Sequence, residues 1–320
     1  MDAQHTQFLI IGAGMAGLSC ASQIAGAGRA VRVLDKGRGP GGRMAARRTE
    51  IVGKTVSFDH GAQYFTARDP LFQDQIGLWR AQGVVAPWPA AGKDAWVGTP
   101  GMNGPIRAMA EQLDVRWNVR AEKITRKDGV WHVLAGDQHF SCDTLLVAIP
   151  AEQASVLLND QASELASIAG HVRSEPCWAV MAGFAQELAI DADCLRDPDG
   201  AISWAARNSS KPGRSAGAGE CWVLHASPQR SRDILDLGKE EVADLLLADF
   251  FTQTGTQPVA PVHLAAHRWL YAMPSAIKGE PSRYDPAMRV GIAGDYLHSP
   301  RVEGAWISGQ HLAASALATV

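Results

Sequence analysis

The chain has 320 residues, 46% of them hydrophobic, which is enough to bury a substantial core and to form two domains. Its formal net charge of −3 gives no overall attraction to nucleic acid or to anionic lipid, so we expect neither as a partner. The five cysteines contain no CxxC pair and no metal-ligand spacing, which predicts buried thiols and no bound metal. No signal-peptide pattern is present and no stretch approaches the roughly 20 apolar residues of a membrane span, so a cytoplasmic protein is expected.

The N-terminal segment predicts one βαβ unit. An apolar strand over 8–11 leads into a glycine-rich turn, a helix of small residues follows over about 15–27, and a second strand covers 30–34. Asp35 stands at the end of that second strand. The next stretch, 36–48, is dense in glycine and arginine and is expected to be a loop.

The following elements are short and separated by turn residues. We expect a strand over 55–58 and a helix over 71–82. The stretch around Pro87, Pro89 and Gly92 is expected to be irregular and to lie at the surface.

From residue 115 to 121 apolar and polar residues alternate, which predicts a strand. The pair Asp128-Gly129 predicts a hairpin turn into a further strand over 130–134. The continuous apolar run 144–149 is typical of a strand that is buried on both faces.

Residues 151–285 differ in character, because they carry four tryptophans, a stretch at 209–214 that we expect to be flexible, and a helix near 239–251. The last residues again show a strand followed by a helix, as in the N-terminal segment, with the strand over 290–293 and the helix over 302–317. This return predicts a discontinuous cofactor domain into which a substrate domain is inserted.

The turn after the first strand reads Gly12-Ala13-Gly14-Met15-Ala16-Gly17 and fits the pattern G-x-G-x-x-G. The first glycine permits the tight turn, the second lets the backbone approach a pyrophosphate, and the third allows the helix to pack closely on the strand. The phosphates then face the positive end of that helix. Asp35 lies 23 positions after Gly12, where a carboxylate can bond a ribose diol. Together these features predict a bound dinucleotide.

Two further features favour FAD over NAD. Gly41-Gly42-Arg43 follows Asp35 closely, and its arginine can pair with a pyrophosphate. Near the other end of the chain, Gly294-Asp295 follows a strand and Glu303-Gly304-Ala305 opens the last helix. The positive end of that helix suits the pyrimidine side of an isoalloxazine ring, where negative charge gathers on reduction.

Four blocks of sequence resemble the flavin amine oxidase superfamily, and within it the small renalase branch. They are 10–17, 35–43 (D-K-G-R-G-P-G-G-R), 59–65 (D-H-G-A-Q-Y-F), and 294–295 with 301–309 (R-V-E-G-A-W-I-S-G). The stretches 206–214, 222–226 and 266–272 are similar to bacterial renalases in particular.

This resemblance covers most of the chain and implies a mixed α/β fold. It implies a Rossmann-like FAD-binding domain of the amine oxidase and p-hydroxybenzoate hydroxylase type, with an inserted substrate domain built on an antiparallel sheet and helices. We therefore expect residues 1–70, 95–155 and 286–320 to form the FAD-binding domain, and residues 71–94 and 156–285 to form the substrate domain.

The resemblance also implies roles toward FAD. Asp35 would hold the adenosine ribose, Arg43 the phosphates, and Asp295 the ribityl or pyrophosphate region. The main chain of Val119 would meet the adenine, and residues 61–63 and 304–306 would line the flavin. The expected FAD contacts are Gly12, Gly14, Met15, Ala16, Gly17, Asp35, Lys36, Arg38, Gly42, Arg43, Gly61, Ala62, Gln63, Val119, Gly294, Asp295, Glu303, Gly304 and Ala305.

Two differences from the amine oxidases bear on these expectations. Gly39 stands where their pattern usually has an arginine, and Arg38 lies one position earlier, as in renalases. No residue matches their flavin-linking cysteine, so we expect non-covalent FAD.

The resemblance implies an FAD-dependent oxidase with a dihydronicotinamide dinucleotide and O2 as its substrates. Renalases oxidise 2-dihydro and 6-dihydro isomers of NAD(P)H to NAD(P)+, with hydride transfer to flavin N5 and reduction of O2 to H2O2. A dihydronicotinamide already carries a transferable hydride, so no protein base is required and positioning dominates. The sequence leaves open the preferred isomer, the NAD or NADP form, and the oligomeric state.

Several residues are candidates for the substrate site. His225 and His267 lie on predicted strands, and each could orient the nicotinamide carboxamide, tune the flavin, or be a hydrogen-bonded core histidine. Asn208 is a candidate polar contact on the grounds of the resemblance. Candidate walls of the ring pocket are Tyr64, Trp204, Trp269 and Trp306. Cations that could meet substrate phosphates, or could be solvated surface charges, are Arg207, Lys211, Arg214, Arg230 and Arg232.

Two alternatives stay open. The first is a different flavin oxidase or desaturase that acts on an amine or on an apolar substrate such as a porphyrin or carotenoid. Such an enzyme would have a long apolar cavity. A non-catalytic binding module on the same fold would be colourless when purified. The short substrate domain and its basic residues favour the dihydronicotinamide oxidase.

Overall fold

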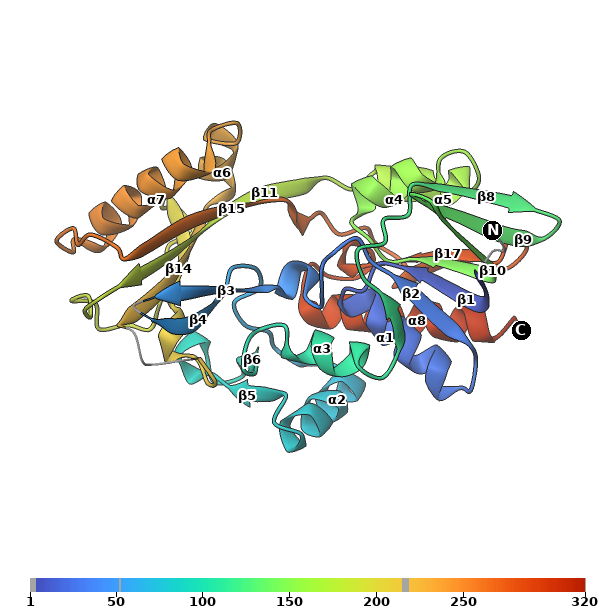
Figure 1. The fold of residues 1–320 in the computed structure, drawn as a ribbon, viewed down its shortest axis with the longest axis horizontal. Helices are drawn as coiled ribbons and strands as arrows, with labels where there is room; N and C mark the ends of the chain where they lie inside the picture. Colours follow the sequence, from blue (N-terminus) through green and yellow to red (C-terminus); the bar gives the residue numbers. More distant parts are fainter. Residues whose placement is uncertain (1–3, 52, 215–218, 320) are drawn as a thin grey trace.

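The larger of the two main sheets carries the predicted βαβ unit. The computed structural model describes residues 4–51, 53–214 and 219–319. Five strands of the sheet run parallel in the order β17-β10-β1-β2-β7, β16 is antiparallel to β17, and β9 joins β10 with β8 beyond it (Figure 1). These strands are β1 (Gln4–Ile11), β2 (Val31–Leu34), β7 (Asp114–Arg116), β8 (Lys123–Lys127), β9 (Val130–Ala135), β10 (Gln138–Val147), β16 (Ser282–Asp285) and β17 (Val290–Ala293).

Helices cover both faces of this sheet. Phe8 and Ile10 of β1 share a buried cluster with α1 (Met15–Gly26) and α8 (Val302–Leu317). Leu9 and Ile11 share a second cluster with α4 (Ala151–Leu158) and α5 (Ser163–Gly170). Side chains alternate along a strand, so a strand between two helical layers must be apolar at every position. This explains why residues 8–11 and 144–149 read as continuous apolar runs.

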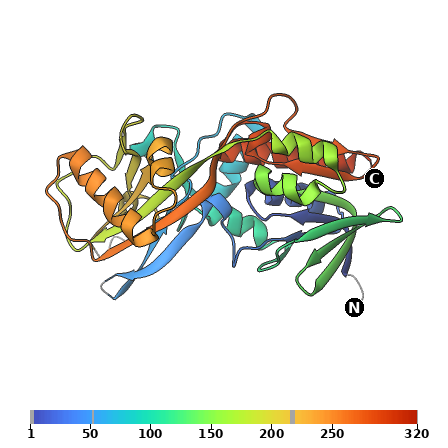
Figure 2. The ribbon, with the colours of Figure 1, turned by 90° about the horizontal axis from the view of Figure 1, so that it is seen from above.

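The second sheet is antiparallel and has the order β12-β13-β14-β11-β15. Its strands are β11 (Ser174–Phe184), β12 (Cys194–Arg196), β13 (Ile202–Arg207), β14 (Glu220–Ala226) and β15 (His263–Pro274). One face packs on α6 (Pro228–Asp233) and α7 (Lys239–Thr254), and the other on the hairpin of β3 (Ala46–Ile51) and β4 (Lys54–Asp59). The molecule has two lobes, and the long strands β11 and β15 reach from one lobe toward the other (Figures 1 and 2).

A smaller group of elements joins the core on the α1 side of the large sheet. It contains α2 (Pro70–Ala81), β5 (Val85–Pro87), β6 (Trp96–Gly98) and α3 (Gly104–Ala110). The side chain of Asp69 accepts a hydrogen bond from Phe72 N at 3.1 Å and caps α2, whose first residue is a proline. The ring of Phe72 packs on Trp306 of α8, with 5.2 Å between ring centroids.

The fold class expected from the sequence is confirmed, and most predicted elements lie within a few residues of their expected bounds. The expected strand over 115–121 is reduced to β7, because the chain turns at Asn118, whose φ is +59°. The loop expected at 36–48 ends early, since β3 begins at Ala46.

Two segments differ in part from their expected character. Around Pro89, the stretch is not irregular but forms the short strand β5 and a 3-10 turn; Pro87, Pro89 and Gly92 are exposed as expected, whereas Trp88 and Ala91 lie in the core. The stretch 209–214 was expected to be flexible, but Lys211 and Arg214 are buried in ion pairs with Asp59. Charge pairing, which a local pattern does not reveal, holds this stretch in place.

The domain boundaries stay a proposal. The helices α4 and α5 share the core beneath the large sheet, and β16 belongs to that sheet. This packing favours moving residues 156–172 and 282–285 from the substrate domain to the FAD-binding domain. Among the described residues, no helix is long and apolar enough to cross a membrane.

Candidate active site

A cavity of about 1890 Å³ lies between the two sheets. On one side it is lined where the parallel strands end: Gly12 follows β1, Asp35 follows β2, Ala148 follows β10 and Gly294 follows β17. Ligands of open α/β sheets bind outside these carboxyl ends, where loops and helix N-termini converge. The facing wall comes from the second sheet and includes Trp204, His225, Trp269 and Tyr271.

The glycine turn has the geometry that a dinucleotide requires. Gly12 has a φ of +108°, and a Cβ there would clash with the carbonyl of Ala148. A Cβ on Gly17 would clash with the carbonyl of Gly12, so α1 can approach β1 only with glycine at this position. Gly14, the N-cap of α1, lines the cavity, and nothing lies within 4 Å of the place where its Cβ would be. The helix N-terminus therefore opens into the cavity as a cradle for an anion.

Asp35 is held by the backbone around it. Its Oδ2 accepts from Ala13 N at 2.7 Å and its Oδ1 from Gly37 N at 2.6 Å. A carboxylate has about four lone-pair sites, so acceptors remain for a ribose diol in the cavity. Val119 N donates to Asp35 O at 2.9 Å, which brings the residue expected at the adenine to the same end of the cavity.

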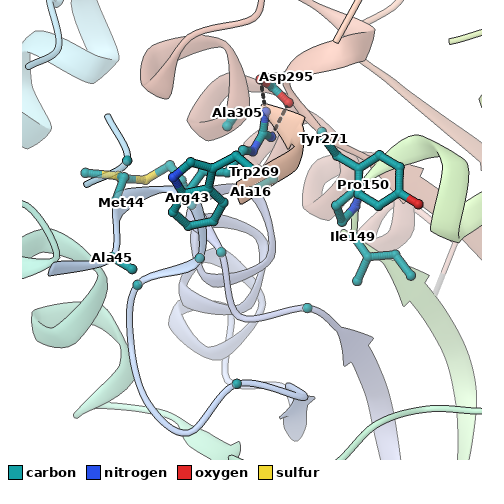
Figure 3. A pocket seen from close by; sticks show the side chains of 18 of the residues that line it. Ala16, Arg43, Met44, Ala45, Ile149, Pro150, Trp269, Tyr271, Asp295 and Ala305 are labelled. Carbon is teal, nitrogen blue, oxygen red and sulfur yellow. Dashed lines mark hydrogen bonds and ion pairs between the residues drawn. The ribbon is translucent and has the colours of Figure 1, made fainter. Parts of the chain in front are cut away.

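Arg43 and Asp295 join the two ends of the chain across the cavity (Figure 3). The guanidinium donates two hydrogen bonds to the carboxylate, at 2.9 Å and 2.5 Å, and a third to Ala272 O at 3.2 Å. Buried Glu303, in the first turn of α8, accepts from the backbone N–H groups of Arg68 and Asp69 at 2.5 Å and 2.7 Å. Residues far apart in sequence thus form one continuous lining.

His225 faces the cavity as a neutral imidazole. Burial lowers its pKa to about 4. Its Nε2 lies 3.3 Å from His60 O, and since a carbonyl only accepts, Nε2 carries the proton and donates. The lone pair is then on Nδ1, which no described residue bonds. His225 therefore lines the cavity with an acceptor that no described residue uses.

Aromatic rings form the rest of this wall. Tyr64 and Trp204 stack with 5.3 Å between centroids, and the guanidinium of Arg196 lies over both rings. Trp269 donates its indole N–H to His60 O at 2.8 Å. In the view of Figure 3, Trp269 is drawn near Arg43, and Tyr271 is drawn beside Pro150 and Ile149; all of these residues line the cavity.

Most of the expected site residues line the cavity. They are Gly12, Gly14, Met15, Ala16, Asp35, Lys36, Arg38, Gly42, Arg43, Gly61, Ala62, Gln63, Tyr64, Val119, Trp204, His225, Trp269, Gly294, Asp295, Glu303 and Ala305.

Ten expected residues do not line the cavity, and four of them, all basic, are described in the next paragraph. Gly17 and Gly304 lie behind it at helix contacts, and Trp306 packs on Phe72 in the core. His267 lies beside the cavity wall with its ring against His60 and Trp269. The remaining two have structural partners: Asn208 donates to Ser57 O and accepts from Asp59 N, and Arg207 pairs with Glu220 and Asp193.

The five cations expected at substrate phosphates are all paired with carboxylates. Arg207 is paired as above, Lys211 and Arg214 bind Asp59, Arg230 binds Asp249, and Arg232 binds Glu175. None of them lines the cavity.

Tyr271 is a cavity residue that the sequence reasoning missed. It lies two positions after Trp269 on β15 and so shares its face of the strand, a period-two signal that was available in the sequence.

Two family models match this chain. The model described as a flavin containing amine oxidoreductase matches residues 89–317, and that described as an NAD(P)-binding Rossmann-like domain matches residues 10–75. The second match includes the glycine turn and Asp35, and the first includes every strand of the second sheet.

Solved structures show a similar fold. A protein described as a protoporphyrinogen oxidase from Exiguobacterium sp. 255-15 has a TM-score of 0.76 at 14% identity, with 98% of this chain and 99% of that chain covered. Wild-type putrescine oxidase bound to putrescine has a TM-score of 0.72 at 14% identity, with 99% and 100% covered. Cyclohexylamine oxidase from Brevibacterium oxydans IH-35A has a TM-score of 0.65 at 12% identity, with 97% and 98% covered. At these identities the likeness concerns the fold.

Proposed function

The chain belongs to the flavin-containing amine oxidoreductases, and within that family we propose that it is an oxidase of dihydronicotinamide dinucleotides, as in the renalase branch. FAD is its cofactor. The open cradle at Gly14, the acceptors on Asp35 and the cavity along the strand ends fit that dinucleotide. When bound, FAD supplies the acceptor for two electrons, which O2 then takes up.

The excess positive charge of the cavity lining is the main observation that favours a dinucleotide substrate over an amine. Among the described residues that line it are ten lysines and arginines but only six aspartates and glutamates, in a chain whose net charge is −3. The two phosphates of FAD offset only part of this excess. The remainder favours a second phosphate-bearing ligand and disfavours a protonated amine. These cations line the cavity, whereas the five cations that the sequence suggested do not.

His225 provides the expected contact for the nicotinamide. The substrate's carboxamide N–H₂ is a donor, and the Nδ1 lone pair of neutral His225 is a matching acceptor on the wall. The reaction converts a dihydronicotinamide dinucleotide, O2 and a proton to the oxidised dinucleotide and H2O2. The hydride leaves a ring carbon and the product ring becomes aromatic, so no side chain has to remove a proton and binding geometry dominates.

The cysteines support non-covalent binding of FAD. Cys177 is the one cysteine among the described cavity-lining residues, and its Sγ lies near Trp178 O and Ala226 O. Burial raises the pKa of its thiol to about 12, so it is held in the unreactive protonated form.

Stopped-flow reduction tests this proposal. Separated 2-dihydro, 6-dihydro and ordinary 4-dihydro isomers are mixed anaerobically with the FAD-loaded protein while flavin absorbance is followed, and putrescine serves as the amine control. We expect rapid bleaching by the 2-dihydro or 6-dihydro isomer and H2O2 on admission of air. Bleaching by putrescine alone, or by none of the four, would refute the assignment.

A further inference from the structure

A cluster of buried charges lies directly behind the cavity wall. Asp59 at the end of β4 accepts from Lys211 Nζ at 3.3 Å and from the guanidinium of Arg214, both through Oδ2. The side chains of all three residues are at most 1% exposed. Two cations meet one carboxylate, so the cluster carries one surplus positive charge away from water. The proposed reaction uses none of these residues.

Gln63 links this cluster to the cavity. Lys211 Nζ donates to its Oε1 at 3.0 Å, and its Nε2 donates to Gly61 O at 2.9 Å and to Asp59 O. A lysine can only donate and a carbonyl can only accept, so these partners set the orientation of the amide without ambiguity. The Nε2 atom of Gln63 lies 3.4 Å from Nε2 of His225. Gln63 and His225 both line the cavity, whereas Lys211 does not.

We propose that Lys211 is a positioning residue, which holds the amide of Gln63 against the cavity and places positive charge behind the loop that faces the flavin. This inference rests on the expected contact of residues 61–63 with FAD. The reduced state of FAD carries more negative charge than the oxidised state, so a buried positive charge nearby favours reduction. The low dielectric of the site strengthens that effect, because the side chain of Lys211 is fully buried.

The groups around Lys211 act on its charge in opposite directions, because Asp59 and Cys194 favour the ammonium form and Arg214 disfavours it. Asp59 lies on β4, Arg214 on the same loop as Lys211, Cys194 on β12, and the ring of Trp88 lies 5.1 Å from Nζ. Burial lowers the pKa of Lys211 to about 8, against the opposing effect of Asp59. At pH 7 the ammonium form therefore predominates.

Potentiometric titration of the FAD-loaded protein with a chemical reductant and a reference dye tests this role. In Lys211→Met, we expect the equilibrium constant for flavin reduction to fall about tenfold or more, which is a shift of about 30 mV for a two-electron couple. Arg230→Met is the matched control: it removes an arginine that pairs with Asp249 on α7 and does not line the cavity. Its potential should equal that of the wild type.

Two further variants complete the test. If Lys211→Met does not fold, Lys211→Gln removes the charge but retains a donor for Gln63 Oε1, and a smaller fall in the same direction is expected. In a Gln63→Leu background, Lys211→Met should shift the potential less, because the link is already absent.

An unchanged potential in a folded, FAD-loaded Lys211 variant would overturn the proposal, as would an equal shift in Arg230→Met. An undiminished shift in the Gln63→Leu background would show that Lys211 does not act through Gln63. No nicotinamide enters this measurement, so its result is distinguishable from a failure of the proposed substrate.

Discussion

Replacing Asp59 by asparagine should destabilise the protein far more than removing either of its partners. The change keeps the shape of the side chain, and Oδ1 can still accept from Met102 N, which lies 2.9 Å away. On the Oδ2 side, however, an NH₂ group would face Lys211 and Arg214, which are themselves only donors. The variant would bury two cations with no carboxylate between them.

The structure gives the magnitude of this loss. Removing one partner of a buried ion pair costs about 3–5 kcal/mol, because the uncompensated charge stays buried. We therefore expect Asp59→Asn to lower the free energy of unfolding by at least about 3 kcal/mol. Lys211→Met should cost much less, about 1 kcal/mol, because it leaves a neutral pair of Asp59 with Arg214 and replaces a desolvated ammonium by an apolar chain.

Urea unfolding at pH 7, followed by tryptophan fluorescence at saturating FAD, measures both changes. The midpoints should move while the slope of free energy against urea stays constant. The reasoning would be refuted if Lys211→Met cost as much as Asp59→Asn, or if Asp59→Asn cost less than about 1 kcal/mol.

Four other predictions concern the cavity and its walls. Gly17→Ala places a Cβ against the carbonyl of Gly12, so it should lower the free energy of unfolding by about 1–3 kcal/mol and reduce the absorbance of bound flavin per chain. Gly26→Ala, whose Cβ would lie in open space, should change neither quantity. In steady-state assays, His225→Gln should raise the KM for the dihydronicotinamide about tenfold, which is the effect of one lost hydrogen bond, and should leave kcat nearly unchanged. The control His267→Gln should change KM less than about twofold. Equal effects of the two variants would contradict the placement of His225, and not His267, at the cavity. Burial lowers the pKa of His60 and of His225 to about 4, so on acidification the unfolded chain takes up protons before the folded protein does. The free energy of unfolding should therefore be unaffected by these histidines above about pH 6.5 and should fall as the pH drops toward 4. Urea titrations should show a loss of up to about 3 kcal/mol per histidine. Finally, added salt should raise the KM for the dinucleotide, because it screens the excess of cations in the cavity; a KM independent of salt would argue against electrostatic recognition.

The cofactor half of the site was predictable because its signals are local. Gly12 and Asp35 follow their strands directly, and the backbone geometry of the turn requires Gly12 and Gly17. The substrate half was not predictable in this way. The sequence of residues 209–214 is typical of a flexible stretch. In the structure, however, Lys211 and Arg214 donate hydrogen bonds to Asp59, about 150 positions earlier in the chain.

The same limit applies to the histidines. His225 and His267 lie in similar apolar contexts on β14 and β15, the two strands that flank β11, and both are paired with Ala179, but only His225 lines the cavity. The ring of His267 packs against His60 and Trp269 instead, and no periodicity in either strand encodes that difference.

The sequence by itself thus determined the βαβ unit, the glycine turn, the acid at the end of the second strand and the closing helix, because short-range sterics and alternation dictate them. Only the tertiary structure decided which charges face the ligand and which neutralise one another. Ion pairs such as Arg43 with Asp295, and Lys211 with Asp59, join residues distant in sequence, and the energy of a charge depends on its burial and on its partner. Both of these exist only once the chain has folded.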